Sequence, residues 1–377
     1  MVQTLEKSIS LENHWPQIVG IGSPNPKIAV CMSGGVDSST SAYLLKKKGY
    51  ETIGLTGWLI KGAGRCCDNG MVDAAKICEY LGVSHISKDL RVFFKNEIVD
   101  PFIHSYSTGY TPIPCITCNN TIKWGSLMEY AFSDLGCTHI ATGHYAKLTV
   151  ENCHGKSLYK IVRPKDLKKD QTFMLWGLSQ EVLSKTVFPL GDLTKEEVRE
   201  VARQGNLFLS EKEESQDICF VSEKEGTQGF LSKFLDKKEG FIIENKTGKI
   251  LGTHQGTYNY TIGQRKGLGI AYCEPLYVVD LDIENNIVYA GTQEELEGYE
   301  LIAKDVNWIF PLEMQSIASV RAKIRYNSKT APAKVSILDN NQIKVVFNEP
   351  QSAITPGQSV VLYDESDQVL LGGGWII

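Results

Sequence analysis

The order of apolar and polar stretches along the first 225 residues predicts strands that alternate with helices. Short apolar runs predict strands at 28–32, 52–58, 84–90 and 139–146. Apolar residues at helical spacing predict helices at 38–48, 72–81, 93–105, 119–135 and 194–204. This alternation is typical of an α/β fold, in which helices cover a parallel sheet and ligands bind at the carboxyl ends of its strands.

The pattern changes near residues 224–229. A short helical stretch and a turn-rich segment follow, and from about Leu301 the chain reads almost wholly as strands, at 320–326, 333–338, 342–347, 359–363 and 369–375. Turn residues separate these strands at Asp339-Asn340-Asn341 and at Thr355-Pro356-Gly357. We therefore expect an N-terminal extension (1–26), an α/β domain (27–225), a small central domain (226–300) and a C-terminal antiparallel β-barrel (301–377).

A glycine- and serine-rich loop, Ser33-Gly34-Gly35-Val36-Asp37-Ser38-Ser39, joins the first predicted strand to the first predicted helix. Glycines let backbone N–H groups crowd round an anion, and the start of a helix adds a positive field. The three serine hydroxyls are further donors, and Asp37 could hold a metal or cap the helix. An ordinary strand-to-helix turn is the alternative. The Walker pattern is absent, but the loop resembles the PP-loop of ATP pyrophosphatases, which cut ATP between its α- and β-phosphates.

Composition narrows the class of protein. The 377 residues are 42% hydrophobic and 22% charged, as in a soluble protein of two or three domains. The net charge of −5 means that any nucleic-acid surface must be local. We expect no membrane helix, because no apolar run approaches about 20 residues, and no secretory signal, because residues 1–27 are polar and mixed. The ten cysteines then indicate a reducing compartment, where thiols serve metals or catalysis.

Two cysteines stand near a proline-stiffened loop at 111–114. The pattern places Cys118 just ahead of a helix that begins near Asn119, where the positive helix end would lower the thiol pKa, with Lys123 adding to the effect. Cys115 precedes it by three residues, and Cys219 stands alone far along the chain.

Three interpretations of these thiols remain open: a structural or half-used metal pair, a redox disulfide, and sulfur transfer with a persulfide on Cys219 and Cys118 as its partner. An ATP-activating loop beside reactive thiols favours sulfur transfer. The adjacent Cys66 and Cys67 could be metal ligands or exposed thiols, and the sequence does not decide between them.

Six separated motifs together resemble one family over about residues 27–377, the tRNA-specific 2-thiouridylases, which place sulfur on C2 of the wobble uridine. The motifs lie at 33–39, 111–123, 141–146, 169–175, 218–220 and 260–269. The resemblance implies an adenine-nucleotide α-hydrolase-like catalytic domain at 27–225 and a tRNA-binding central domain at 226–300. It also implies ATP and Mg²⁺ as cofactors, adenylation of uracil O2 at tRNA position 34, and sulfur delivery from a persulfide. The products are 2-thiouridine, AMP and pyrophosphate.

The resemblance also implies roles for individual residues. Cys118 and Cys219 are the catalytic thiols and can form a transient disulfide. The ATP site consists of Cys31, Met32, Ser33, Gly34, Gly35, Val36, Asp37, Ser38, Gly57 and Gly143. The tRNA contacts are Ile113, Pro114, Cys115, Lys169, Asp170, Gln171, Arg325 and Tyr326, the first three of them at the target base. The expected partners are the tRNA anticodon loop and a sulfur-donor protein, such as a cysteine desulfurase or a relay, and no membrane.

Two positions depart from the family pattern. Cys115 replaces an aspartate of many relatives, so Cys115, Cys118 and Cys219 could instead hold a [4Fe-4S] cluster. Cys31 stands where many relatives have glycine, and its role is unexplained. The segment 62–68 resembles cyanobacterial or plastid-type members, which predicts a bacterial cytoplasm or, alternatively, a plastid stroma.

Local charge and two histidines complete the candidate chemistry. Basic residues gather at 321–334, 160–169 and 265–266 and could contact phosphates, or could simply form solvated faces. His144 is either a satisfied polar group or a contact to ATP or to the base, whereas His254 is expected to be structural. The rival functions are a PP-loop ligase that needs no sulfur and a tRNA-binding protein with a decayed site.

Overall fold

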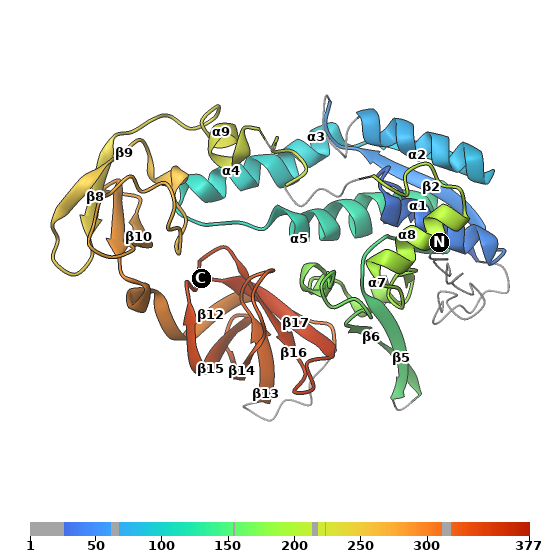
Figure 1. Cartoon of the computed structure of the whole chain (residues 1–377). Coiled ribbons are helices and arrows are strands. Elements are labelled where there is room, and N and C mark those ends of the chain that lie inside the picture. The colour runs from blue at the N-terminus through green and yellow to red at the C-terminus, as the bar shows by residue number, and fades with distance from the viewer. Residues whose placement is uncertain (1–25, 62–67, 154, 213–217, 223, 311–317) are drawn as a thin grey trace, which may run out of the picture. The chain divides into compact units, whose positions relative to one another are not determined.

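A computed structural model describes residues 26–61, 68–153, 155–212, 218–222, 224–310 and 318–377, and the chain divides into two compact units (Figure 1). The first unit contains the chain up to Phe94 together with Cys118–Phe220, and the second contains Lys95–Thr117 and Val221–Ile377. No helix in the described part of the chain has the length and apolar character needed to cross a membrane.

A parallel sheet of five strands forms the centre of the first unit, as predicted. Its order is β3 (Ser84–Asp89), β2 (Glu51–Trp58), β1 (Lys27–Cys31), β4 (His139–Ala141) and β7 (Thr186–Val187). Because β1 pairs with β2 on one side and with β4 on the other, the order of the strands reverses at β1. The crevice at the carboxyl ends of β1 and β4 is therefore the position where such sheets bind ligands.

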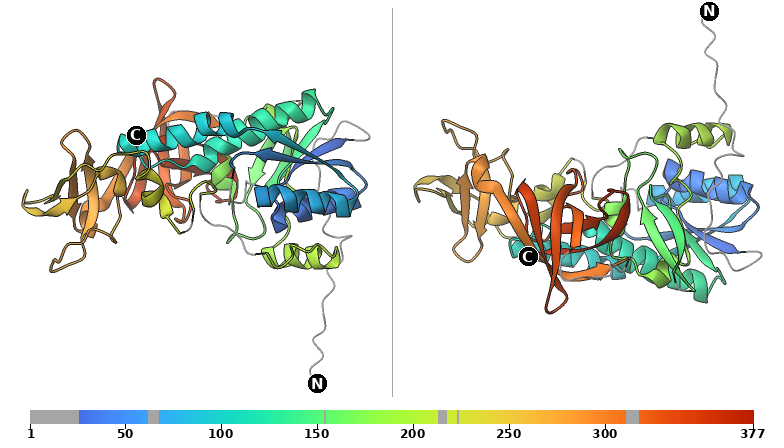
Figure 2. Two further views of the ribbon diagram at one scale, coloured as in Figure 1. Left: turned by 90° about the horizontal axis from the view of Figure 1, so that it is seen from above. Right: turned by 90° about the horizontal axis from the view of Figure 1, so that it is seen from below.

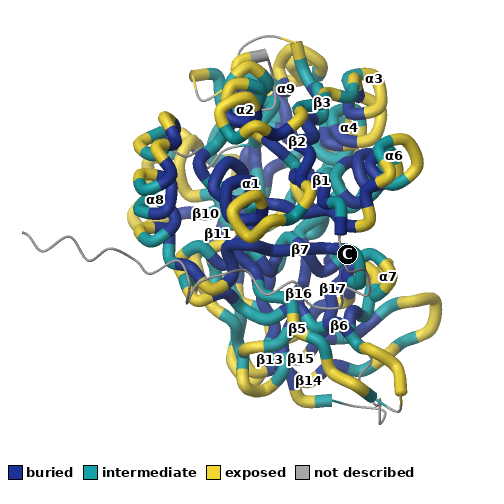
Figure 3. Tube along the Cα trace, turned by 90° about the vertical axis from the view of Figure 1, so that its right-hand side faces the viewer, coloured by how far each residue is buried: buried dark blue, intermediate teal, exposed yellow. Residues whose placement is uncertain are grey.

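Helices cover this sheet on both faces (Figure 3). α1 (Val36–Lys47), α2 (Asp68–Leu81) and α8 (Lys195–Gln204) share one buried apolar cluster with β1 and β4. The expected helix start at Thr194 is confirmed, because the Thr194 hydroxyl accepts from the Glu197 N–H and the Glu197 carboxylate accepts from the Thr194 N–H.

Two helical segments are longer than predicted. α5 (Pro114–Cys118), the π-helix η3 (Asn119–Leu127) and α6 (Met128–Ser133) follow one another without a break. The same holds for α3 (Arg91–Phe94), the π-helix η2 (Lys95–Val99) and α4 (Asp100–Ser107). The prediction that Cys118 precedes its helix is therefore wrong. Helices often begin with proline, as here at Pro114, so it is Cys115 that lies in the first turn.

Several shorter elements complete the first unit. The predicted strand at 139–146 ends at Ala141, and a hairpin that the pattern did not predict follows, with β5 (Lys147–Cys153) antiparallel to β6 (Lys156–Val162). The 3-10 turn η4 (Thr172–Leu175) and α7 (Gln180–Leu183) precede β7.

The central part of the second unit is a small mixed sheet. Its strands lie in the order β10 (Tyr277–Asp282), β11 (Ile287–Gly291), β8 (Gly240–Glu244) and β9 (Ile250–His254). α9 (Gly226–Leu231) and the 3-10 turn η5 (Thr257–Asn259) accompany it. His254 is structural as expected, because its ring is buried and hydrogen-bonded to the Asn286 carbonyl and the Gly256 N–H.

The C-terminal part is the predicted antiparallel barrel, seen from two further sides in Figure 2. After η6 (Gln293–Leu296), its strands are β12 (Glu297–Trp308), β13 (Ala318–Lys323), β14 (Ala331–Leu338), β15 (Gln342–Ser352), β16 (Ser359–Tyr363) and β17 (Val369–Ile376). Pairing of β12 with both β15 and β17 closes the barrel round an apolar core. β13 ends at Lys323, so Arg325 and Tyr326 lie in a turn and not in the predicted strand.

Candidate active site

The phosphate loop lies at the carboxyl end of β1, and glycine is required at one position in it and at one position in the neighbouring loop after β4. Gly34 has a φ of +68°, and a Cβ atom there would lie 2.3 Å from the Gly70 carbonyl oxygen. A Cβ atom at Gly143, in the loop after β4, would lie 2.8 Å from the backbone nitrogen of Ser38. The Ser33–Ser39 loop therefore packs backbone against backbone, on α2 at Gly34 and on the loop after β4 at Ser38, with no room for a side chain at either glycine.

The serine hydroxyls of the loop differ in what they can offer a ligand. The Ser38 hydroxyl accepts from the Ser33 N–H at 3.2 Å, and the two hydroxyl oxygens are 3.3 Å apart. Ser33 itself is exposed. Ser39 is fully buried and donates to the Gly35 carbonyl at 2.8 Å, so the expectation that its hydroxyl serves as a phosphate donor is wrong.

Asp37 is held by two donors and does not cap the helix. Gly35 is the capping residue of α1, and Asp37 lies in its first turn. The Asp37 Oδ1 atom accepts from the Lys195 ammonium at 2.7 Å and from the Tyr145 hydroxyl at 2.9 Å. Sequence reasoning missed Lys195, although a cation directly after the helix cap Thr194 is an unusual choice at the positive end of a helix.

A second lysine that sequence reasoning missed reaches the loop from the segment after α8. The Lys212 ammonium donates to the Gly34 carbonyl at 2.8 Å and to the Asp73 carboxylate at 2.6 Å. It therefore fixes the left-handed glycine of the loop against α2. No local signal in the sequence marks this lysine.

Gly57, which is predicted to line the adenosine site, is under weaker steric constraint than Gly34 and Gly143. A Cβ atom at Gly57 would meet only flexible side-chain ends, the nearest being Leu59 Cδ2 at 3.2 Å. The Thr56 hydroxyl next to it donates to the Met32 carbonyl at 3.1 Å, which holds the end of β1 against β2. The assignment of Gly57 to the adenosine site stays a prediction.

His144 is buried and hydrogen-bonded at both ring nitrogens. Nδ1 lies 2.8 Å from the Thr142 hydroxyl and Nε2 lies 3.5 Å from the Lys123 ammonium. Burial, and secondly the Lys123 charge, lower the pKa of His144 well below its usual value, so the ring is neutral near pH 7. Trp124 stacks beside it at 5.5 Å between ring centroids.

Cys31, whose role the sequence leaves unexplained, is an inert thiol beside the loop. Its residue retains part of its surface, yet the thiol is enclosed, and burial raises its pKa to about 12 against an opposing effect of the Lys123 charge. The thiol pKa depends on the atoms around the sulfur, not on the exposed part of the backbone. Cys31 is therefore protonated at neutral pH and is not a nucleophile.

The three cysteines of the predicted chemistry differ in exposure. Cys115 is exposed, whereas Cys118 and Cys219 are partly buried. Phe220 packs its ring edge-on against Phe94 at 5.8 Å, which anchors the residue next to Cys219 within the first unit. Cys66 and Cys67 lie outside the described residues.

A metal centre was the other interpretation of these thiols. Across the described ranges, no group of three or more His, Cys, Asp or Glu side chains is placed to hold a metal ion. Cys115 lies in the second unit, whereas Cys118 and Cys219 lie in the first, so the iron–sulfur alternative stays a prediction and we derive no step through a cluster.

Much of the predicted basic cluster at 160–169 is neutralised by acidic partners. Lys160 pairs with Glu151, and Lys165 pairs with Glu197 at 2.6 Å. Arg163 pairs with Asp170, which is only 6% exposed, at 3.0 Å. This segment is therefore less positive than its sequence suggests.

The motif 169–171, predicted to contact tRNA, contributes mainly internal hydrogen bonds. Asp170 also accepts from the N–H and the hydroxyl of Thr172. The Gln171 side chain accepts from the Tyr145 N–H at 3.0 Å, and the Gln171 N–H donates back to the Tyr145 carbonyl at 3.1 Å. Lys169 retains partial exposure, and the tRNA contacts of all three residues stay predictions.

Arg325 and Tyr326 lie together in the turn after β13. The Arg325 guanidinium donates to the Ser352 carbonyl at 2.9 Å, and the Lys323 ammonium lies 5.6 Å from the centre of the Tyr326 ring. Both residues are partly exposed, so an aromatic face stands among cations. Such a surface suits a stacked base beside a phosphate, and the tRNA contacts of Arg325 and Tyr326 stay predictions.

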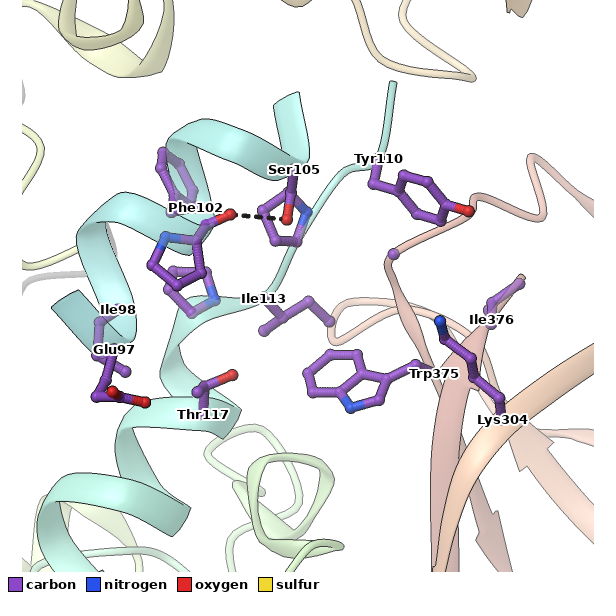
Figure 4. Close-up of a pocket in the computed structure, with 14 residues that line it drawn as sticks. Glu97, Ile98, Phe102, Ser105, Tyr110, Ile113, Thr117, Lys304, Trp375 and Ile376 are labelled. Carbon is purple, nitrogen blue, oxygen red and sulfur yellow. Dashed lines mark hydrogen bonds between the residues drawn. The ribbon is translucent and has the colours of Figure 1, made fainter. Parts of the chain in front are cut away.

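A cavity of about 310 Å³ lies within the second unit, and Ile113 and Pro114 line it (Figure 4). Trp375 and Lys304 project into it from the barrel strands, while Glu97 and Phe102 belong to the helical side. The volume falls at the lower end of the range for small-ligand sites.

The loop that carries Ile113 is tied to the turn before β16. The Thr111 N–H donates to the Pro356 carbonyl at 3.0 Å, and the Gln358 amide donates to the Thr111 carbonyl at 2.7 Å. Gly357 between them has a φ of +87°. This turn therefore fixes one wall of the cavity.

The fold and the loop together define the class of protein. A Ser-Gly-Gly-x-Asp-Ser loop at the point where the order of a parallel sheet reverses is the site of a PP-loop nucleotide-binding enzyme. Family models match almost all of the chain: a tRNA methyl transferase HUP domain at 26–223, a tRNA methyl transferase PRC-barrel domain at 228–292 and an aminomethyltransferase β-barrel domain at 299–376.

Curated relatives narrow the class further. The chain is 47% identical to the tRNA-specific 2-thiouridylase MnmA of Nostoc punctiforme over 350 residues, covering 93% of this chain and 98% of that protein. It is 46% identical to the tRNA-specific 2-thiouridylase MnmA of Trichormus variabilis, covering 92% and 97%. The chain therefore belongs to the tRNA-specific 2-thiouridylase family, and it is a sulfurtransferase-type enzyme despite the methyl transferase wording of the domain models.

Solved structures resemble the chain more weakly. The U34-tRNA thiolase NcsA of Methanococcus maripaludis, solved with its [4Fe-4S] cluster, is 20% identical and covers 59% of this chain and 67% of that chain. Its TM-score is 0.35, which is too low to support any conclusion about mechanism.

Proposed function

We propose that this enzyme catalyses the ATP-dependent 2-thiolation of the wobble uridine, position 34, of tRNA. The phosphate loop at the sheet's reversal point carries the proposal, because glycines are required on both sides of the crevice. The family named for this reaction supplies the substrate, since the loop alone does not say which group ATP activates.

In the first step, uracil O2 attacks the α-phosphorus of ATP, and the bond to the bridging oxygen breaks to release pyrophosphate. The loop N–H groups and the Ser33 hydroxyl bind the phosphates, and the start of α1 adds its positive field. Mg²⁺ is usually held by one or two carboxylates together with substrate phosphates, so Asp37 is the residue that fits it here. When bound, Mg²⁺ neutralises phosphate charge.

In the second step, sulfur from a Cys219 persulfide replaces the activated oxygen at C2, and AMP leaves with that oxygen. In one route the Cys118 thiolate attacks the Cys219 sulfur, the persulfide S–S bond breaks, and hydrosulfide is released to attack C2. In the other route the persulfide attacks C2 directly, and Cys118 then resolves the mixed disulfide. Either route ends in a Cys118–Cys219 disulfide, which two electrons from a thiol reductant restore.

The target base must leave its stack to reach the thiols. We assign the loop residues Ile113, Pro114 and Cys115 to contacts with that base, which is supported by the cavity that Ile113 and Pro114 line. Lys169, Arg325 and Tyr326 are assigned to the anticodon loop. The sulfur donor is a persulfide-carrying protein, and the setting is a cyanobacterial-type cytoplasm or a plastid stroma.

The test is single-turnover thiolation of a tRNA transcript by enzyme preloaded with persulfide, with ATP and Mg²⁺ present. Cys118→Ser and Cys219→Ser should each abolish 2-thiouridine formation. Cys273→Ser, which changes an exposed thiol of the central domain, should leave it unchanged. Full thiolation by Cys219→Ser would remove the persulfide role.

Iron and labile-sulfide assays on anaerobically purified enzyme separate the persulfide route from the cluster alternative. Activity without iron supports the persulfide route, whereas activity that depends on iron contradicts it. A PP-loop ligase without sulfur chemistry would release AMP with a product that contains no new sulfur.

A further inference from the structure

Asp37 is the centre of a small hydrogen-bond network with two buried donors, which the reaction as described above does not explain. Its Oδ1 atom accepts two hydrogen bonds, from the Lys195 ammonium at 2.7 Å and from the Tyr145 hydroxyl at 2.9 Å. Within the described part of the chain, its Oδ2 atom receives no hydrogen bond, and the side chain is 29% exposed. One carboxylate oxygen is thus fixed and the other remains available at the loop.

Both donors are themselves held firmly. Lys195 is 8% exposed and begins α8, whose start is fixed by the capping box at Thr194. Tyr145 is 2% exposed, and Gln171 holds its backbone through both the N–H and the carbonyl. The orientation of Asp37 is therefore set by two separate parts of the chain.

A purely stabilising role does not account for Lys195. Burying an ammonium costs several kcal/mol, and apolar replacements of buried ion pairs are often neutral or stabilising. The first position of a helix is also the least favourable place for a cation, because the helix dipole is positive there. Lys195 therefore lowers the stability of the fold in two ways, and a role in the nucleotide site explains why a lysine is present there.

We propose that Lys195 and Tyr145 are positioning residues that hold Asp37 with its Oδ2 atom directed to the Mg²⁺ of MgATP. Donors on one carboxylate oxygen restrict rotation of the group, so the other oxygen meets the metal without further ordering. Removal of such outer partners typically weakens metal binding by about 10- to 100-fold. This inference rests on the proposed use of ATP, but it does not depend on tRNA or sulfur.

The test measures ATP binding by calorimetry across a series of Mg²⁺ concentrations, without tRNA or a sulfur donor. Tyr145→Phe removes one hydroxyl and keeps the ring, and Lys195→Met removes the ammonium. Each should raise the Mg²⁺ concentration needed for half-maximal ATP binding by about 10-fold or more. ATP binding without divalent metal should change little, and Lys195→Arg should partly restore the Mg²⁺ response.

Lys165→Met is the matched control. This variant removes the 2.6 Å ion pair between Lys165 and Glu197, and Glu197 lies in α8 like Lys195. Lys165 does not contact Asp37, so the Mg²⁺ response of the variant should equal that of the parent enzyme. Electron paramagnetic resonance of Mn²⁺ in the ATP complex supplies a second readout, which should report weaker binding in Tyr145→Phe.

An unchanged Mg²⁺ response in the folded Tyr145→Phe variant would overturn the inference. Equal effects of Lys165→Met and Lys195→Met would do the same, because the change would then belong to the helix and not to Asp37. If the parent enzyme does not thiolate tRNA while the variants still shift the Mg²⁺ response, the proposed function is contradicted and the inference stands.

Discussion

A single added methyl group at Gly143 should disable the nucleotide site. The Cβ atom of Gly143→Ala would lie 2.8 Å from the Ser38 nitrogen and 2.9 Å from the Asp37 carbonyl carbon. Both are backbone atoms at the start of α1, so no side chain can swing away to make room. Ordinary contacts begin at 3.4 Å, and the two loops must therefore separate by about 0.6 Å.

Two effects of that separation can be estimated. Overpacking of this kind costs about 1–3 kcal/mol of unfolding free energy. A misplacement of about 1 Å at a reacting centre can cost roughly 100-fold in rate, so we expect a loss of at least about 10-fold in kcat/KM for ATP. The loss in activity should exceed what the fraction of unfolded protein explains.

The assay is release of AMP with saturating tRNA, combined with urea denaturation of the same preparations. Gly252→Ala in β9 is the control, because its Cβ would meet nothing nearer than Ile270 at 3.8 Å. That variant should keep the kcat/KM of the parent. Parent-like kcat/KM for ATP in a folded Gly143→Ala enzyme would refute the placement of the phosphates in this crevice.

Three further predictions concern other parts of the molecule. Gly357→Ala, at a φ of +87° and with its Cβ 2.9 Å from the Thr111 nitrogen, should weaken tRNA binding in a filter assay while ATP binding stays unchanged; loss of both would contradict this. Thr194→Ala should lower the urea-measured unfolding free energy by about 1 kcal/mol, and no change would argue against the cap. Burial lowers the pKa of His144, so the unfolded chain takes up its proton first as the pH falls below about 6.5. The stability that the neutral ring contributes is complete above that pH and falls by up to about 1.4 kcal/mol per pH unit below it. His144→Gln should flatten the dependence of the unfolding free energy on pH between pH 7.5 and 5.5. An unchanged slope would be evidence against a buried neutral His144.

The sequence predicts those features that a short stretch of chain determines. The loop at Ser33–Ser39 follows from adjacent glycines and hydroxyls, and the helix at 194–204 follows from its apolar spacing. The parallel sheet and the closed barrel follow from alternation that repeats along each half. The pattern does not predict β12, because charged residues on its exposed face interrupt the alternation of apolar and polar residues.

Partners that come from distant parts of the chain could not be predicted. Lys195 is 158 residues from Asp37, and Lys212 is 178 residues from Gly34, so no local pattern records either contact. The basic cluster at 160–169 was overestimated for the same reason, since Glu197 neutralises Lys165 from 32 residues away. Two prolines at 112 and 114 predict a loop, but the helix begins at Pro114, because proline also suits a first helical turn.

The measurement that tests the central claim most directly follows the oxygen of the target base. A tRNA carrying ¹⁸O at C2 of uridine 34 is thiolated in a single turnover with unlabelled ATP, and the masses of the products are measured by mass spectrometry. Adenylation of O2 predicts AMP with one ¹⁸O atom, unlabelled pyrophosphate and 2-thiouridine in the tRNA. Thiolated tRNA with unlabelled AMP, or with ADP and phosphate as the nucleotide products, would contradict the account.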